Sequence, residues 1–369
     1  MKLWSISFAY RLGLGFHALN NEGAEGSNLM QPRRIDVGKE TYDGISGEII
    51  RHHILENFVN VCRARNIPCF PLSEALHPDR GPLGIRQAAK RSGVNVLSKR
   101  NPEALYPAVR AAISSCAVLD VGGFLAPFAE RPEAGADGAE QAVVAPENAI
   151  AESLADIGRR NDGGAPYTVK RDSVFDVAWL ISERPQDTAI TQHAAYRPSG
   201  AQSLFSQTMR SNVYGGVIRA DLHRIGTDDY WYLQQDSGSK DSVSRLAVQI
   251  PEQQKRQKAL IEAIVNFIAS PTGAKVAGWA PHVFLTEGCV LLTSSRTAPF
   301  SSPIKVDLND LEAPVKADPD YAKVMASLHD GNDTSAWRFD NVKSLLDALP
   351  SIANKLDGDK NGQNKSQAN

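Results

Sequence analysis

The chain has 369 residues, of which 42% are hydrophobic, and a formal net charge of −2. This length suits one elaborated domain or two, and the apolar content is enough for a real core. The near-neutral charge argues against a generic nucleic-acid binder. No run of about 20 apolar residues occurs, which argues against a membrane span. The four cysteines are too few for a dense disulfide framework.

The charge is unevenly distributed along the chain. Residues 1–110 carry 15 Lys and Arg against 10 Asp and Glu, whereas the remainder carries 25 against 32. Such asymmetry permits a basic face on a nearly neutral protein.

Residues 1–7 hold one basic residue and a polar-interrupted apolar run, which is typical of a first strand and not of a signal peptide. Together with the low cysteine count, this pattern favours a reducing cytoplasm.

The predicted elements alternate between strands and helices. Strands are predicted from apolar runs and period-two alternation at 3–14, 116–121, 174–181, 213–222, 243–250 and 290–292. Helices are predicted from helical apolar spacing, caps and prolines at 46–65, 101–115, 251–270, 318–328 and 340–356. A polar loop separates the first strand from the first helix.

This order predicts an α+β fold. The split βαβ order of an RRM-like (ferredoxin-like) palm is strand, helix, strand, strand, helix, strand. In this chain, large insertions interrupt that order. The palm core is expected to span 1–293, followed by a C-terminal helical part at 294–356 and a polar, disordered tail at 357–369. The segments 66–100 and 126–166 are predicted to be finger-like or mobile insertions.

The start of the first helix is the leading candidate site. Ser46 is a small polar cap, and Gly47 allows a ligand to approach the backbone closely. A helix N-terminus offers free N–H groups and partial positive charge, which suits a phosphate. Arg51, with His52 and His53 beside it, reaches the same phosphate. The structural alternative is an ordinary capped helix with these three side chains partly facing solvent.

Short motifs follow one another in order over residues 3–293. They are, along the chain, His17 to Gly23, Arg33-Arg34, Ser46-Gly47 with Arg51-His52, Asp120 to Leu125, Lys170 to Ser173, Gln192-His193, Tyr214, Asp221 to Gly226, Gly273 to Lys275 and Pro281-His282. This set resembles the DevR-like backbone subunits of the type I CRISPR Cascade complex, within the RAMP superfamily. The segments 126–166 and 226–248 have no counterpart in that pattern.

The resemblance implies a right-hand-like protein that multimerises along a guide RNA. An RRM-like palm would bind the guide (crRNA) phosphates, and a thumb hairpin within 183–211 would kink the RNA and touch the next copy. The aromatic-rich Gly-Phe-x-Phe strand of base-reading RRMs is absent, which favours backbone binding. The residues implied to bind RNA are Asn20, Asn21, Arg33, Arg34, Ser46, Gly47, Arg51, His52, Lys170, Arg171, Gln192 and His193.

The resemblance also implies a set of partners. These are the guide crRNA, the target DNA strand that pairs with the guide, further copies of the chain in a helical filament, and other Cascade subunits. The implied role is antiviral defence in the prokaryotic cytoplasm, with no membrane association and no cofactor.

The alternative function is a metal-dependent RNA endonuclease on the same RAMP scaffold. Type III relatives cleave target RNA with an aspartate in the loop after the first strand, where this chain has Asp36 and Asp43. The candidate acid–base residues are His17, His53 and His193. A lone aspartate in a polar loop is more often solvated or capping, and no nuclease motif is complete. We therefore predict that the protein is not an enzyme.

A zinc site is the remaining alternative. Cys62, Cys69 and His77 follow the first helix, with His52 and His53 nearby in sequence. Their Cys-x6-Cys-x7-His spacing is loose compared with the Cys-x2-Cys pairs of zinc sites. The other interpretation is two reduced, half-buried thiols, and we predict no metal.

Overall fold

The structure is a computed structural model, and it describes the following residues: 3–18, 21–22, 29–93, 106–128, 167–185, 189–196, 202–234, 244–272, 281–294, 297–305, 313–328 and 334–357. The chain forms two compact units. Unit 1 comprises Met1–Val61, Phe175–Arg224 and Gln257–Asn369, and unit 2 comprises Cys62–Val174 and Ile225–Arg256.

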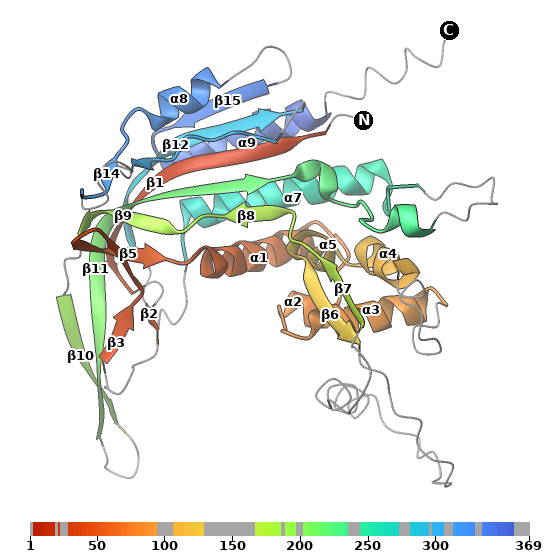
Figure 1. The fold of residues 1–369 in the computed structure, drawn as a ribbon, viewed down its shortest axis with the longest axis horizontal. Helices are drawn as coiled ribbons and strands as arrows, with labels where there is room; N and C mark the ends of the chain where they lie inside the picture. The colour runs from red at the N-terminus through yellow and green to blue at the C-terminus, as the bar shows by residue number, and fades with distance from the viewer. Residues whose placement is uncertain are drawn as a thin grey trace. The chain divides into compact units, whose positions relative to one another are not determined.

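The fold is mixed α+β and is built on an antiparallel sheet (Figure 1). The strands of unit 1 are β1 (Ser5–His17), β2 (Asn21–Glu22), β3 (Leu29–Pro32), β4 (Arg34–Val37), β5 (Glu40–Ile45), β8 (Phe175–Val177), β9 (Leu180–Pro185), β10 (Ala189–Tyr196), β11 (Gln202–Ala220), β12 (His282–Thr293), β13 (Ile304–Lys305), β14 (Lys316–Ala317) and β15 (Thr334–Phe339). Its helices are α8 (Tyr321–Ser327), α9 (Val342–Asp357) and most of α1 (Gly47–Ala64) and α7 (Ile250–Ala269).

The main path of the sheet runs β15-β12-β1-β11-β9-β5-β4, and each neighbouring pair on it is antiparallel. The long β1 lies between β11 and β12, with Tyr10 opposite Gly216 on one side and Gly288 on the other. The crossover from β1 to the strand pair β8 and β9 contains α1, and the crossover from β11 to β12 contains α7. The first strand in the chain is therefore central in the sheet.

Period-two alternation along β1 separates two buried faces. On one face β1 contributes Ile6, Phe8, Tyr10, Leu12 and Leu14, which have no exposed surface. On the other face, Ala9, Cys289 and Leu291 pack against Tyr321 and Met325 of α8. Burial on both faces explains why β1 contains so few charged residues.

Unit 2 is a small α+β body. Its elements are α2 (Pro71–Glu74), α3 (Arg80–Arg91), α4 (Tyr106–Ser115), α5 (Ala117–Gly122) and the hairpin of β6 (Phe124–Phe128) with β7 (Tyr167–Arg171). The carboxylate of Asp120 lies at its centre, 2.5 Å from Arg171 Nη2 and 2.9 Å from Arg256 Nη1. Gly226 donates its N–H to the same carboxylate, so the buried charge is fully surrounded by donors.

Several sequence predictions differ from the structure. The strand predicted at 116–121 is the helix α5, because a short, wholly apolar run does not distinguish a buried strand from a buried helix. The strand predicted at 243–250 is reduced to one bridge between Thr227 and Leu246. The part at 294–356, predicted to be helical, also contains β13, β14 and β15. Most of 126–166 and of the tail lies outside the described residues.

No helix in the described ranges is both long enough and apolar enough to cross a lipid bilayer.

Candidate nucleic-acid interface

Ser46 begins α1 as an N-cap, as the sequence predicts. Its hydroxyl accepts a hydrogen bond from Ile49 N at 3.3 Å, and its carbonyl accepts one from Ile50 N at 3.2 Å. Gly47, however, faces protein and not open space, because a Cβ built on it would lie 2.2 Å from the carbonyl oxygen of Val177. The glycine is therefore required for close packing against β8, and the ligand-approach interpretation of Gly47 is not supported.

The cations around this helix start are the exposed part of the site. Arg51 and His52 lie on the solvent face of α1, and Arg51 makes no hydrogen bond or ion pair within the described part of the chain. His52 Nε2 lies 3.4 Å from a carboxylate oxygen of Glu56. Glu48 is also exposed in the first turn. These groups make a mixed surface in which Arg51 is the side chain available to an anion.

The β4–β5 hairpin brings the paired arginines beside the helix start. Arg33 accepts a hydrogen bond at its carbonyl from Gly44 N, 3.2 Å away, and β5 leads directly into Ser46. The Arg33 guanidinium lies over the indole of Trp179, 5.1 Å from the ring centroid. Trp179 is 36% exposed, and the sequence alone did not indicate it because its contact with Arg33 depends on sheet pairing far along the chain.

A buried polar cluster holds the same end of unit 1 together. Arg210 Nε of β11 lies 2.9 Å from Asp43 of β5, and both side chains are almost completely buried. Arg34 is opposite Asp43 in the β4–β5 pairing. His17 of β1 is opposite Arg210, and its Nε2 is 2.8 Å from the hydroxyl of Tyr214. This cluster joins four strands at the point where β11 leaves the central sheet.

The buried polar cluster also shifts the pKa values of His17 and Asp43. Burial, reinforced by the positive charge of Arg210, lowers the pKa of His17 to about 3. Burial raises the pKa of Asp43 against the opposing charge of Arg210. A neutral imidazole and an ion-paired carboxylate, both inaccessible to solvent, do not form an acid–base pair that a substrate could reach.

Within the segment 183–211, β10 pairs with the first half of β11 as a hairpin. The pairing runs from Ala189 opposite Met209 to Tyr196 opposite Gln202. Gln192 and His193 lie in β10, opposite Ser206 and Phe205. Their side chains, that of Asn21 in β2, and the whole of Asn20 lie outside the described residues, so their predicted contacts with RNA stay predictions.

Arg171 has a structural role that the sequence did not reveal. Its side chain has no exposed surface and bonds the carboxylate of Asp120 and the carbonyl of Thr227. A guanidinium held in this way cannot reach a phosphate, so the assignment of Arg171 to the RNA-binding set is wrong for the structure described. Lys170, its neighbour in β7, is 61% exposed and 3.5 Å from Asp172. Both residues belong to unit 2, whereas the arginines near the start of α1 belong to unit 1.

The cysteines of unit 2 form a cluster of thiols. Cys69 interacts with both Cys62 and Cys116, and burial raises the pKa of Cys116. His77 instead accepts a hydrogen bond from Asp79 N at its Nδ1. Among the residues that the structure describes, no group of three or more His, Cys, Asp or Glu side chains is arranged to hold a metal ion.

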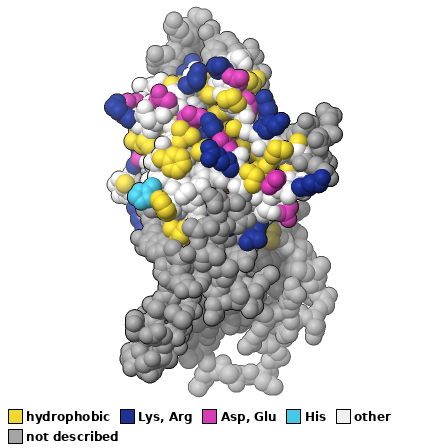
Figure 2. Space-filling view, turned by 90° about the vertical axis from the view of Figure 1, so that its left-hand side faces the viewer, with side chains coloured by type: hydrophobic (Ala, Val, Ile, Leu, Met, Phe, Trp, Pro, Cys, Tyr) yellow, Lys and Arg dark blue, Asp and Glu magenta, His cyan; other side chains and the backbone are white. Residues whose placement is uncertain are grey.

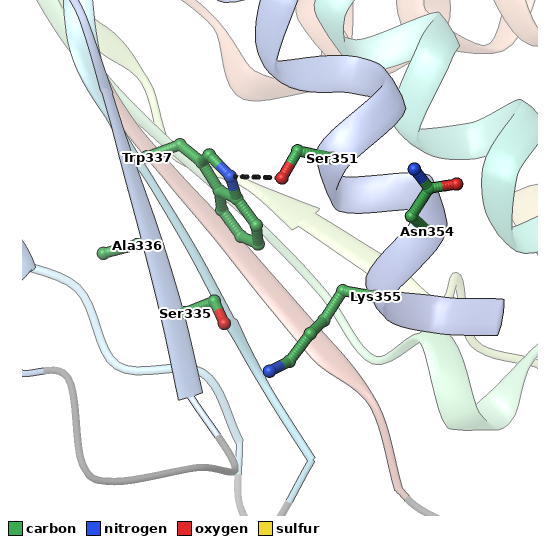
Figure 3. Close-up of a pocket in the computed structure, with 6 residues that line it drawn as sticks. All are labelled: Ser335, Ala336, Trp337, Ser351, Asn354 and Lys355. Carbon is green, nitrogen blue, oxygen red and sulfur yellow. Dashed lines mark hydrogen bonds between the residues drawn. The ribbon is translucent and has the colours of Figure 1, made fainter. Parts of the chain in front are cut away.

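An open pocket lies between β15 and α9 of unit 1 (Figure 3). Its wall is formed by Ser335, Ala336, Trp337, Ser351, Asn354 and Lys355. The indole Nε1 of Trp337 donates to Ser351 Oγ at 3.0 Å, and Lys355 is the only titratable group in the wall. This arrangement lacks the paired groups that acid–base catalysis requires.

On one face of the molecule, the charged side chains of the described residues lie at separate points (Figure 2). Figure 2 shows basic, acidic and hydrophobic side chains intermixed over the described part of one face of the molecule. Nucleic-acid contact on such a surface would depend on individual cations and not on one continuous basic patch.

Comparisons with known proteins give one family. The family described as "CRISPR-associated negative auto-regulator DevR/Csa2" matches residues 8–311. Among solved structures, the chain is similar to a chain of a "CRISPR RNA-guided surveillance complex, pre-nicking", with 12% identity, 90% of each chain covered and a TM-score of 0.41. It is also similar to a chain of a "CRISPR RNA-guided surveillance complex", with 10% identity, 91% of this chain and 86% of that chain covered and a TM-score of 0.35. No curated protein matches the sequence.

Proposed function

The chain belongs to the DevR/Csa2 family of CRISPR-associated proteins, and on this premise we propose that it is a non-catalytic backbone subunit that binds the phosphates of a guide crRNA. Copies of the chain multimerise along the guide and, with other Cascade subunits, present it for pairing with a target DNA strand. The site of this action is the prokaryotic cytoplasm, in antiviral defence.

One observation carries the proposal. The exposed Arg34 and Arg51, with His52, lie around the same end of unit 1 from which the β10–β11 hairpin extends. Arginine presents a planar fork of donors that suits phosphate oxygens. Contacts of this kind read the backbone and leave the bases free, which a guide-presenting subunit requires.

The strand order supports an RRM-like palm in unit 1. Counting only the palm strands, β1 is first, the β8–β9 pair second, β11 third and β12 fourth, with α1 and α7 in the two crossovers. The order in the sheet is then fourth, first, third, second, which is the ferredoxin-like arrangement. We assign the β10–β11 hairpin to the thumb and the segments 66–100 and 126–166 to the finger-like insertions.

The absence of catalysis is part of the proposal. Of the candidates for an endonuclease, Asp43 is committed to Arg210, and His17 is buried and neutral. His53 is bound to Glu56 at 2.6 Å, and Asp36 accepts a hydrogen bond from Thr41. These residues do not converge on a position where a phosphodiester and two metal ions could sit.

Reconstitution tests the proposal. Purified protein is mixed with a guide-length single-stranded RNA, and binding, assembly and RNA integrity are measured together. The proposal predicts a protected, intact RNA that carries several copies of the protein. Discrete cleavage products or the absence of binding would contradict it.

A further inference from the structure

Two phenylalanines are exposed at one end of the central sheet in unit 1. Phe16 is 66% exposed, and Phe284 is 61% exposed. They lie on neighbouring strands, because Gly15 of β1 is opposite His282 of β12 and Leu14 is opposite Val283. The His282 ring meets the Phe16 ring edge-on, with centroids 6.1 Å apart and planes at 83°. We call Phe16, His282 and Phe284 the aromatic cluster.

The backbone holds Phe16 outward at a cost in strain. Its φ is 50°, in the left-handed region that side chains larger than glycine avoid. The pairing of β1 with β11 shifts between Leu14 and His17, and Phe16 N donates to the hydroxyl of Ser211 at 3.0 Å. A strained residue of this kind persists only where its surroundings determine it, and such residues concentrate at functional sites.

Glycine supports one face of the Phe284 ring. A Cβ on Gly13 would lie 2.4 Å from Cε2 and 2.6 Å from Cδ2 of Phe284, and a Cβ on Gly15 would lie 3.8 Å from Cδ1. The ring therefore lies across β1 where side chains are missing. An aromatic ring over a glycine stabilises a sheet, and this explains the covered face of Phe284. It explains neither the exposed face nor the outward Phe16.

Buried cross-strand neighbours link the aromatic cluster to the proposed RNA interface. Phe16 precedes His17, which is opposite Arg210, and Arg210 is paired with Asp43. Asp43 is in turn opposite Arg34. Cross-strand neighbours thus connect the exposed phenylalanines with an exposed arginine of the interface and with the base of the β10–β11 hairpin.

We propose that Phe16 and Phe284 form a stacking platform for an unstacked base of the bound guide RNA. This inference rests on the proposed function and adds a base-contacting subsite to it. Stacking on aromatic rings is sequence-tolerant, because every base has a π-face, so it is compatible with a guide of any sequence. Two exposed phenylalanine rings present far less area than the roughly 800 Å² per partner of a stable protein interface, so a single base is a better match for them than a protein surface.

Leucine substitutions test the platform. Phe284→Leu and Phe16→Leu keep an apolar side chain and remove the π-face, whereas Phe284→Trp enlarges it. Phe300→Leu is the matched control, since Phe300 is another exposed phenylalanine of unit 1, at 46%. The probe is a guide-length single-stranded RNA with 2-aminopurine at successive positions, together with the same RNA made abasic at those positions. Folding is checked by circular dichroism.

The platform predicts a loss specific to bases. Each leucine variant at the platform should bind the normal RNA about 5- to 150-fold more weakly, Phe284→Trp should bind at least as tightly as wild type, and Phe300→Leu should be unchanged. Binding should quench 2-aminopurine at some positions with wild type and less with the leucine variants. Unchanged affinity in both leucine variants, or an equal loss on the abasic RNA, would overturn the inference. The second result would indicate a contact with the backbone or with another protein.

Arginine variants separate this inference from the proposed function. If Arg34→Ala and Arg51→Ala weaken binding while the leucine variants do not, the stacking platform is wrong and the phosphate interface stands. If wild-type protein does not bind the RNA, both proposals fail.

Discussion

Arg171 and Asp120 form an ion pair of 2.5 Å in which neither side chain has exposed surface. Arg256 completes the cluster at 2.9 Å from the second carboxylate oxygen. Removing one partner from a buried ion pair leaves an uncompensated charge in a site of low dielectric constant, which is strongly destabilising. Arg171 therefore matters for the stability of unit 2, although its position in the sequence suggested contact with RNA.

We expect Arg171→Ala to lower the free energy of unfolding by about 3 kcal/mol, as measured by urea denaturation. Lys170→Ala, at the exposed neighbouring position, is the matched control and should change stability by less than about 0.5 kcal/mol. Under conditions where Arg171→Ala is still folded, its affinity for RNA should equal that of wild type. A folded Arg171→Ala protein with a reduced salt dependence of RNA binding would restore Arg171 to the interface.

Arg34→Ala combined with Arg51→Ala should weaken RNA binding equally for all sequences. The slope of log affinity against log salt should shrink by roughly one for each phosphate that the protein no longer neutralises. Arg338→Ala, at an exposed arginine of β15, controls for the removal of charge alone and should leave the slope unchanged. Weaker affinity for one RNA sequence only would show that these arginines do not contact the backbone.

The hairpin should be required for assembly and not for folding. Replacing residues 190–205 by a short Gly/Ser linker removes most of the β10–β11 pairing and leaves the Arg210–Asp43 contact in place. We expect a folded monomer that no longer multimerises on RNA, as measured by size-exclusion chromatography with light scattering. Assemblies of normal length would rule out the thumb assignment.

His17 should make the protein sensitive to acid. Its folded pKa of about 3 lies below the ordinary value of 6.5, so the unfolded chain binds a proton that the folded chain does not. The stabilisation is complete above about pH 6.5 and is lost as the pH falls towards 3. Between about pH 7 and pH 4.5, wild type should lose about 2–3 kcal/mol more than His17→Gln.

Glutamine keeps a hydrogen-bonding group near Tyr214 and removes the titration. The folded pKa of Asp43 is raised, so its contribution to the free energy of unfolding increases as the pH falls, opposite to that of His17. Asp43 is present in both proteins, so its contribution cancels when wild type is compared with His17→Gln. Parallel losses of stability in wild type and His17→Gln would show that the imidazole is not held neutral.

Caps, helical spacing and period-two alternation in the sequence correctly predicted elements that are determined by a few adjacent residues. The Ser46 cap, the spacing of α1 and α7 and the alternation of β1 are confirmed, because each is a property of a few adjacent residues. The strand predicted at 213–222 is longer, since β11 begins at Gln202. Residues 202–208 are mostly polar, so they form no apolar run from which a strand could be predicted.

Contacts between residues far apart in the chain determine the features that the local sequence does not predict. The partner of Arg171 is 51 residues away, and Trp179 meets Arg33 only through the folded sheet. Nothing within either local sequence distinguishes a buried arginine from a phosphate-binding one. A Cβ on Gly47 would lie 2.2 Å from the carbonyl oxygen of Val177, and this close packing against a distant strand is likewise not visible in the local sequence.

The dependence of assembly on RNA length is the sharpest test of the proposed role as a backbone subunit. The protein is mixed with intact single-stranded RNAs that differ in steps of a few nucleotides, and the mass of each complex is measured by native mass spectrometry. A subunit that multimerises along a guide predicts complexes whose protein copy number rises in regular steps with RNA length, each on uncut RNA. A copy number that does not depend on RNA length, or complexes that contain cleaved RNA, would contradict the account.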